Sequence, residues 1–433
     1  MMHRKEVAII GFGLEGQALF NFLKKSGGHN FTILDRKRDL KIPNGAAAVL
    51  GPAYLKNLER FDIIFRSPGV PYNSPEFSGL KNKLSSLSKL FFELKKGAVI
   101  GITGSAGKTT AATLLYKILR NAGKDAYLCG NIGINALSIL NRLKKNSITV
   151  MELSSFQLQD LKKSPEVAIL LDIYEEHLNM HKNFAEYLNA KANIALYQHN
   201  SDTLIYAADN KYSKKIARLS RAKKLGYSIS HPSSIFTKNG WIIYKNKKVI
   251  PLFEIKLVGK HDQKNIMAAT LAAISCAVKP TIIRNTVKQF RGLPHRIEFV
   301  KNIKGVKYYD DSKATNVKSA IAGIDAINGR KIVLAGGLNK NLDMTPLAKR
   351  LLENDVSYAV LFGKSKNEIA KKLKQLGANK YKTAVDLKSA ILIAHKKAIP
   401  GDAVLLAPAT ASFDQFKSYE ERGDIFKKLV RRL

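Results

Sequence analysis

Short apolar runs alternate with longer segments of helical periodicity along most of this 433-residue chain. Runs of four to eight residues, rich in Val and Ile and bounded by Gly, Pro or Ser, are typical of strands buried on both faces. They predict strands over 7–10, 31–35, 61–65, 99–102, 147–153, 167–173, 203–209, 306–309, 331–337, 356–363 and 403–407. Helical patterns lie between them, for example over 17–25, 113–120 and 264–277. This alternation predicts an α/β protein with parallel sheets.

The alternation is interrupted twice. A Ser- and Lys-rich stretch over 84–96 is expected to hold a first linker, and the Gly- and Pro-containing segment 292–296 a second. We therefore predict a Rossmann-like domain over 1–92, a central domain over 93–294 and a second Rossmann-like domain over 295–433. The segment from about 211 to 255 is expected to be irregular meander and hairpin.

The best-defined motif joins the strand over 99–102 to the helix over 113–120. Its candidate ligand-binding residues are Gly104, Ser105, Gly107, Lys108, Thr109 and Thr110. Glycines let backbone N–H groups close around phosphate oxygens, Lys108 can neutralise a phosphate, and the Thr109 hydroxyl can bind Mg²⁺. The match to the standard pattern is imperfect, since the first glycine is Gly101 and not residue 102. We predict an ATP site in a central P-loop ATPase domain.

A second glycine motif, Gly11-x-Gly13-x-x-Gly16, follows the first predicted strand, and Asp35 ends the second. This pattern is typical of a nucleotide-binding βαβ unit, although such a unit can also bind nothing. Ser67, Pro68 and Gly69 form a stiff loop after the next strand, at the edge where such sheets bind ligands.

Polar side chains follow two strands of the central domain. Glu152 comes at the end of one strand and His177 after the next, while Lys191 lies in the following helix. A carboxylate and an imidazole after successive strands make a plausible Mg²⁺ shell. Taken singly, each of these three residues could equally be a solvated helix or loop residue. For His177 alone, that interpretation is favoured over a role in the site.

The net charge is unusual, at +38. Such a charge permits electrostatic binding of nucleic acid or an anionic membrane. The lysines, however, occur in scattered pairs without a basic tail, which favours a general lysine bias over a specific nucleic-acid surface. Two cysteines offer neither a disulfide framework nor a metal cluster. Without an apolar run of membrane-spanning length or a recognisable signal peptide, we expect a cytoplasmic protein that does not insert into membranes.

Ten motifs, in order over essentially the whole chain, resemble those of the Mur ligases. They are Gly11-x-Gly13-x-x-Gly16, Ser67-Pro68-Gly69, 103–109, 130–133, 152–157, Glu176-His177, Ala190-Lys191, 292–296, 311–316 and 411–416. The blocks over 152–157 (Glu-Leu-Ser-Ser-Phe-Gln) and 311–316 (Asp-Ser-Lys-Ala-Thr-Asn) are highly specific. The resemblance implies a ligase of peptidoglycan precursor synthesis that uses ATP and Mg²⁺ to join D-glutamate to UDP-N-acetylmuramoyl-L-alanine through an acyl phosphate. We expect a monomer.

The resemblance also implies roles for individual residues. The catalytic set would be Lys108, Glu152, His177 and Lys191. The metal ligands would be Thr109, Glu152, His177 and Lys191, the last as a carbamate. The nucleotide would further contact Asn265, Arg296 and Asp311. The UDP substrate would contact Leu14, Glu15, Asp35, Arg36, Ser67, Gly69 and Asn131. Glutamate would be bound by Lys313, Thr315, Lys340, Ser412 and Tyr419.

Three residues depart from the family pattern. Ala106 replaces an Asn beside the phosphates, Glu15 stands where Ser or Thr is usual, and Asp262 replaces an Asn after His261. A carboxylate at position 15 should repel a diphosphate, so we expect this position to bind differently.

Three other functions compete with this reading. The first is a related ligase with another acceptor, such as a folylpolyglutamate synthase. This function would not account for the motifs at Ser67–Gly69 and 412–416. A basic P-loop ATPase acting on nucleic acid would leave Lys313, Thr315 and Ser412 without a role. A non-catalytic homologue is disfavoured by Lys108, Glu152, His177 and Lys191.

Overall fold

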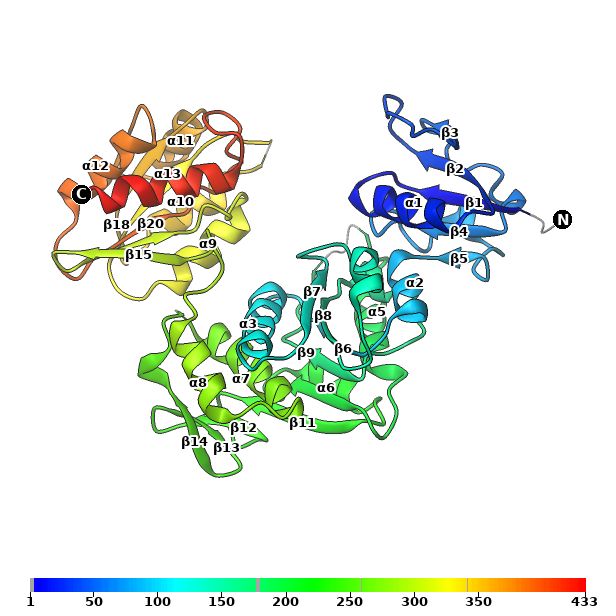
Figure 1. Cartoon of the computed structure of the whole chain (residues 1–433). Coiled ribbons are helices and arrows are strands. Elements are labelled where there is room, and N and C mark those ends of the chain that lie inside the picture. Colours follow the sequence, from blue (N-terminus) through cyan, green and yellow to red (C-terminus); the bar gives the residue numbers. More distant parts are fainter. Residues whose placement is uncertain (1–3, 177–179, 258, 341) are drawn as a thin grey trace. The chain divides into compact units, whose positions relative to one another are not determined.

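A computed structural model describes residues 4–176, 180–257, 259–340 and 342–433 (Figure 1). The chain divides into two compact units, one of residues 1–254 with 260–288 and one of residues 255–259 with 289–433. Three sheets carry the α/β fold, two in the first unit and one in the second. Within the described residues no helix is long and apolar enough to cross a membrane.

The first sheet is parallel throughout, as predicted. Its strand order is β3 (Ala46–Leu50), β2 (His29–Asp35), β1 (Lys5–Ile10), β4 (Ile63–Arg66) and β5 (Leu84–Ser85). Alternate residues of β1 enter different cores: Val7 and Ile9 pack on one face, and Ala8 and Ile10 on the other. Burial on both faces explains why this strand reads as a continuous apolar run.

The glycine turn between β1 and α1 (Leu14–Ser26) is set by steric contact. Gly11 has a φ of +82°, and a Cβ on Gly16 would lie 2.2 Å from the carbonyl oxygen of Gly11. Only glycine allows α1 to begin this close to the strand.

The central sheet joins parallel strands to an antiparallel extension. Its order is β14 (Lys247–Pro251), β13 (Trp241–Tyr244), β12 (Ile235–Lys238), β11 (Lys223–Ser228), β10 (Thr203–Ala207), β9 (Val167–Leu170), β6 (Ala98–Thr103), β8 (Ile148–Glu152) and β7 (Ala126–Gly130). The hairpins β12–β13–β14 confirm the predicted meander. The rest of 211–255 is more regular than predicted, because Lys211–Ala217 forms helix α6, capped by Asn210, and β11 adds a parallel strand.

The helices of the first unit cover these two sheets. They are α1, α2 (Leu87–Leu94), α3 (Lys108–Asn121), α4 (Ser155–Leu158), α5 (Phe184–Leu196), α6, α7 (Lys260–Ser275) and α8 (Pro280–Gln289). Helix α2 occupies most of the stretch over 84–96 that is expected to hold the first linker: the Ser86 hydroxyl caps it, and Phe91 and Phe92 are buried. The predicted boundary at residue 92 falls within α2, and the domain boundaries stay a prediction.

The third sheet lies in the second unit and has one antiparallel edge strand. Its order is β15 (Glu298–Ile303), β16 (Val306–Asp310), β20 (Ala403–Leu406), β17 (Lys331–Gly336), β18 (Val356–Phe362) and β19 (Tyr381–Thr383). Its helices are α9 (Val317–Ala326), α10 (Thr345–Leu351), α11 (Lys366–Gln375), α12 (Leu387–Lys397) and α13 (Tyr419–Arg431). Val333 and Leu405 pack on one face, and Leu334 and Val404 on the other.

Short 3₁₀ helices complete the secondary structure. They are η1 (Leu58–Arg60), η2 (Pro75–Phe77), η3 (Ala136–Arg142) and η4 (Leu252–Glu254).

Candidate active site

The predicted phosphate loop connects β6 to α3, and β6 lies between β9 and β8 in the second sheet. Gly107 has a φ of +84°, and a Cβ placed there would lie 2.2 Å from Oδ1 of Asn265. The structure therefore packs Asn265, from α7, directly against the loop. The Lys108 ammonium donates to the carbonyl oxygens of Gly104 at 2.9 Å and Ser105 at 3.2 Å.

A carboxylate lies beside the first turn of α3. The Thr109 hydroxyl donates to Glu152 Oε2 at 3.0 Å, and the Asn131 amide donates to Oε1 of the same carboxylate at 2.9 Å. Glu152 is only 1% exposed. Hydroxyl and carboxylate oxygens are the donors that Mg²⁺ prefers, so this pair fits the metal implied by the resemblance.

Lys191 enters the same region from α5. Its Nζ lies 3.0 Å from the Gly104 carbonyl oxygen, 3.4 Å from the Thr103 hydroxyl and 4.7 Å from the centre of the Tyr187 ring. Burial lowers the pKa of this amine well below its usual value, the nearby Lys108 lowers it further, and Glu176 and Glu152 act in the opposite direction. His177, the fourth predicted catalytic residue, lies outside the described residues.

Ser105 holds the loop to the segment that follows β9. Its hydroxyl donates to the Tyr174 carbonyl oxygen at 3.0 Å, accepts from the Tyr174 N–H at 2.9 Å and lies 2.7 Å from the Tyr187 hydroxyl. Thr110 is buried in α3, and Ala106 is exposed. Tyr187 was not predicted, because a tyrosine on an amphipathic helix gives no functional signal in the sequence.

The predicted diphosphate residues lie where β1 turns into α1. Leu14 is 88% exposed, whereas Glu15 is largely buried and its carboxylate accepts from the Gln157 amide at 2.9 Å. Burial raises the pKa of Glu15, and the Gln157 hydrogen bond and the Arg66 charge oppose that rise. Glu15 is thus hydrogen-bonded to α4, which follows the strand that ends at Glu152.

The other predicted substrate residues of the first sheet lie at or just beyond the ends of β2 and β4, at the same edge of the sheet as the glycine turn. The Asp35 carboxylate accepts from the N–H groups of Phe12 at 2.8 Å and Lys37 at 2.9 Å, and Arg36 is exposed. The Ser67 hydroxyl donates to the Gly11 carbonyl oxygen at 2.8 Å, and Gly69 is exposed. Asp35 and Ser67 therefore shape the glycine turn itself.

In the second unit, the predicted residues follow β16 and β20. Asp311 is 4% exposed, and burial raises the pKa of its carboxyl to about 8, although the Ile297 N–H at 3.2 Å and the charge of Arg296 oppose the rise. Arg296 is exposed. Asp262, the departure in α7 of the first unit, lies 3.4 Å from His261 Nε2.

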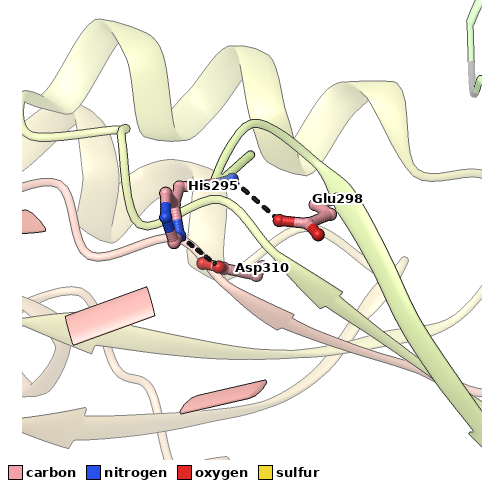
Figure 2. A group of neighbouring side chains, drawn as sticks. All are labelled: His295, Glu298 and Asp310. Atoms are coloured by element: carbon pink, nitrogen blue, oxygen red, sulfur yellow. Dashed lines mark hydrogen bonds and ion pairs between the residues drawn. The ribbon is translucent and has the colours of Figure 1, made fainter. Parts of the chain in front are cut away.

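Three titratable residues, His295, Glu298 and Asp310, form a cluster at β15 and β16 of the second unit (Figure 2). His295 Nδ1 lies 2.8 Å from Asp310 Oδ2, and the His295 N–H donates to the Glu298 carboxylate at 3.0 Å. The Lys427 ammonium also lies 3.1 Å from Glu298. Because this cation already satisfies the carboxylate, we interpret the cluster as an anchor for the segment over 292–296 and not as a metal centre.

Four of the predicted glutamate-binding residues lie on loops that follow strands of the third sheet, and the fifth, Tyr419, begins α13. The Lys313 ammonium lies 6.0 Å from the Tyr419 ring centre, and that of Lys340 lies 5.1 Å from the Phe413 ring centre. Thr315 is partly exposed, and Ser412 is buried at the loop after β20.

Arg422 links these loops and was not predicted. It is fully buried, and its guanidinium donates to the Ser312 hydroxyl and carbonyl oxygen, both at 2.9 Å, and to the Thr410 carbonyl oxygen at 3.2 Å. The sequence around Arg422 does not distinguish it from the many arginines and lysines expected at the surface.

Comparison with known families agrees with this arrangement. The Mur ligase middle domain matches residues 102–273, and the glutamate ligase domain of the Mur ligases matches residues 295–410. A solved MurF ligase from Thermotoga maritima in complex with ADP superposes with a TM-score of 0.60 at 18% identity, covering 100% of this chain and 99% of that one. A MurC ligase from the same organism gives a TM-score of 0.58 at 15% identity, over 99% of each chain.

Curated relatives are similar over the whole length. A UDP-N-acetylmuramoylalanine--D-glutamate ligase from Acetivibrio thermocellus is 34% identical, over 98% of this chain and 96% of its own. The ligase of that name from Geobacillus kaustophilus is 34% identical, over 100% of this chain and 98% of its own. The fold, the site around Lys108 and Glu152 and these full-length similarities lead to one assignment: the chain belongs to the Mur ligase family.

Proposed function

We propose that this protein is an ATP-dependent ligase that joins D-glutamate to UDP-N-acetylmuramoyl-L-alanine in peptidoglycan precursor synthesis. The observation that carries the proposal is the full-length similarity, at 34% identity, to relatives that bear this name. The convergence of Lys108, Thr109, Glu152 and Lys191 on one loop supports catalysis over a purely binding role. An amide ligase of the same family with a different acceptor is the alternative.

The first unit would bind the nucleotide that activates the substrate. Lys108 and the N–H groups around Gly107 would bind phosphates, with Gly104, Ser105, Thr110 and Asn265 shaping the loop. Thr109, Glu152, His177 and Lys191 would hold Mg²⁺, whose charge would stabilise the transferring phosphoryl group when it is bound. Lys191 would serve as a carbamate: its neutral amine bonds to the carbon of CO₂ and releases one proton, which leaves one negative charge shared by two oxygens.

The substrate sites extend the proposal to the other sheets. Leu14, Glu15, Asp35, Arg36, Ser67, Gly69 and Asn131 would contact the UDP substrate. Arg296 and Asp311 would contact the nucleotide, and Lys313, Thr315, Lys340, Ser412 and Tyr419 would bind glutamate. Ser67, Gly69, Asn131, Lys313 and Ser412 lie on loops that follow parallel strands. Open α/β sheets bind their ligands at this edge.

The proposed chemistry has two steps. An oxygen of the alanine carboxylate attacks the γ-phosphorus of ATP, so that ADP leaves and an acyl phosphate forms. The amine of glutamate then attacks the acyl carbon, phosphate leaves, and the amine loses a proton. Exclusion of water by the surrounding loops would protect the acyl phosphate.

Partners and location follow from the same proposal. We propose a cytoplasmic monomer with small-molecule substrates, no specific nucleic-acid partner and no membrane insertion. The domains would span 1–92, 93–294 and 295–433.

One assay tests the function. ADP release is measured with UDP-N-acetylmuramoyl-L-alanine, ATP, Mg²⁺ and each of several amino acids, and it should require both the UDP substrate and D-glutamate. Absence of ADP in folded protein contradicts ligase activity, and preference for another amino acid supports the alternative. DNA or RNA stimulating ADP release without the UDP substrate would support a nucleic-acid ATPase.

A further inference from the structure

Arg66 is a buried cation at the ligand-binding edge of the first sheet. It ends β4 and pairs in register with Ile10, the residue before the glycine turn. Only 3% of the residue is exposed. A guanidinium that is this deeply buried requires hydrogen-bond or ion-pair partners.

Its first partners lie in the loop that follows its own strand. Nη1 donates to the Val70 carbonyl oxygen at 2.6 Å and lies 3.4 Å from that of Ser67. The same side chain therefore holds both ends of the Ser67–Val70 loop, which includes two residues proposed to contact the UDP substrate.

Its other partners belong to the central domain. Nη2 donates to the carbonyl oxygen of Phe156 in α4 at 3.0 Å, and it lies 3.7 Å from the carboxylate of Asp160. Asp160 is also 3.8 Å from the Lys89 ammonium, and its carboxylate oxygens accept no hydrogen bond within the described part of the chain. Phe156 follows Glu152 by four residues, so Arg66 bridges the substrate loop to the segment that carries the proposed metal ligand.

Two further contacts join the same elements. Gln157, next to Phe156, donates to Glu15 at the start of α1. Asn73, beyond the Ser67–Val70 loop, donates to Glu186 of α5, the helix that carries Lys191. The loops of the first sheet are thus attached to α4, which follows the strand that ends at Glu152, and to α5, which carries Lys191. Arg66 is a buried cation among these contacts.

We propose that Arg66 is a positioning residue for ligation: it fixes the Ser67–Val70 loop against the Phe156 carbonyl, so that the donor substrate held by the first sheet presents its carboxylate to the nucleotide site. The inference rests on the proposed function. It needs the planar fork of arginine, because one guanidinium makes hydrogen bonds in two directions and an ammonium cannot reproduce that geometry.

Arg66→Lys tests the geometry while it keeps the charge beside Asp160. The measurements are kcat and KM for each substrate, UDP affinity by calorimetry, and melting temperature. We expect kcat to fall about 10-fold to 100-fold, as small misplacement of reacting groups produces, while the KM for ATP and the affinity for UDP alone change less than about threefold. Lys89→Met removes the other cation near Asp160 without touching the loop, and it should retain the wild-type kcat.

A charge-neutral double variant, Arg66→Met with Asp160→Asn, covers the case in which Arg66→Lys does not fold. It removes both charges of the buried Arg66–Asp160 pair and should show the same loss of kcat with UDP binding retained. Wild-type kcat in either folded variant would overturn the inference, as would a loss of UDP affinity large enough to account for the whole effect. Lack of turnover in the wild-type protein, seen before any variant is measured, would instead count against the proposed function.

Discussion

Thr109 donates its hydroxyl hydrogen to Glu152 Oε2 across 3.0 Å, so the first turn of α3 and the end of β8 meet through one hydrogen bond. The Asn131 amide fixes the other carboxylate oxygen. The two side chains thus have their oxygens oriented before any metal binds, which reduces the reorganisation that binding requires.

This relationship predicts the effect of Thr109→Val, which removes the hydroxyl and preserves the shape of the side chain. Activity should fall by about 10-fold to 100-fold, the usual effect of disturbing a metal's ligands or their partners, and higher Mg²⁺ should restore part of it. Activity titrated against Mg²⁺ checks the prediction. Thr113→Val, one turn later on the same helix, is the matched control and should leave the Mg²⁺ dependence unchanged.

The proximity of Thr109 and Glu152 was predictable, because the carboxyl ends of neighbouring parallel strands meet at one edge of a sheet. The apolar runs likewise located eleven of the parallel strands to within a few residues, but they did not reveal the parallel strands β3, β5, β7, β11 and β19. Arg66 and Arg422 were not predicted as buried. Their hydrogen-bond partners Phe156 and Ser312 lie 90 and 110 residues away in sequence, and nothing local distinguishes them from surface cations. Helix α2 was not predicted, because Ser and Lys outweigh its apolar stripe in the sequence.

Asp311 predicts a pH dependence of stability. Its carboxyl has a pKa of about 8 in the folded protein because it is buried, whereas an unfolded chain loses this proton near pH 4. Between these values the folded state binds more protons than the unfolded state, so the unfolding free energy should fall as pH rises, by up to about 1.4 kcal/mol per pH unit, and level off above pH 8.

Asp311→Asn removes the titrating group and should flatten this dependence, so that the variant gains stability relative to the wild type as pH rises from 5 to 8. Melting temperatures across that range measure the difference. Asp343→Asn, at an exposed carboxylate whose pKa is lowered by hydrogen bonds to Thr345, should run parallel to the wild type. A wild-type minus Asp311→Asn difference that is constant with pH would contradict a raised pKa.

The hydrogen bonds of Arg422 predict that its substitution lowers both the stability of the protein and its binding of glutamate. Its guanidinium ties Ser312 to Thr410, and thereby the loop with Lys313 to the loop with Ser412. Arg422→Lys cannot make the same fork of hydrogen bonds. We expect a loss of about 1.5–3 kcal/mol in unfolding free energy, the usual contribution of a hydrogen bond to a charged group, and a higher KM for D-glutamate with the KM for ATP unchanged.

Urea unfolding and steady-state kinetics measure the two effects of Arg422→Lys. Arg431→Lys makes the same exchange at an exposed position of α13 and should change neither. If glutamate KM stayed at its wild-type value despite the loss of stability, Arg422 would be a structural residue without influence on the proposed glutamate site.

Lys191 leads to the last prediction, that the active protein carries a carbamate on this side chain. An ammonium at this position would lie close to the proposed Mg²⁺ ligands and repel the metal, whereas a carbamate offers two anionic oxygens. Burial and the nearby Lys108 lower the pKa of the amine, and CO₂ reacts only with the neutral form that a lower pKa favours. Protein prepared with ¹³C-bicarbonate should therefore show one carbamate carbon signal by NMR that is absent from Lys191→Ala. That variant should lose nearly all activity and regain part of it with formate or acetate, which can replace the missing carboxylate. A fully active wild-type protein without the signal, at saturating bicarbonate and Mg²⁺, would leave Lys191 as a plain amine bound to the Gly104 carbonyl oxygen.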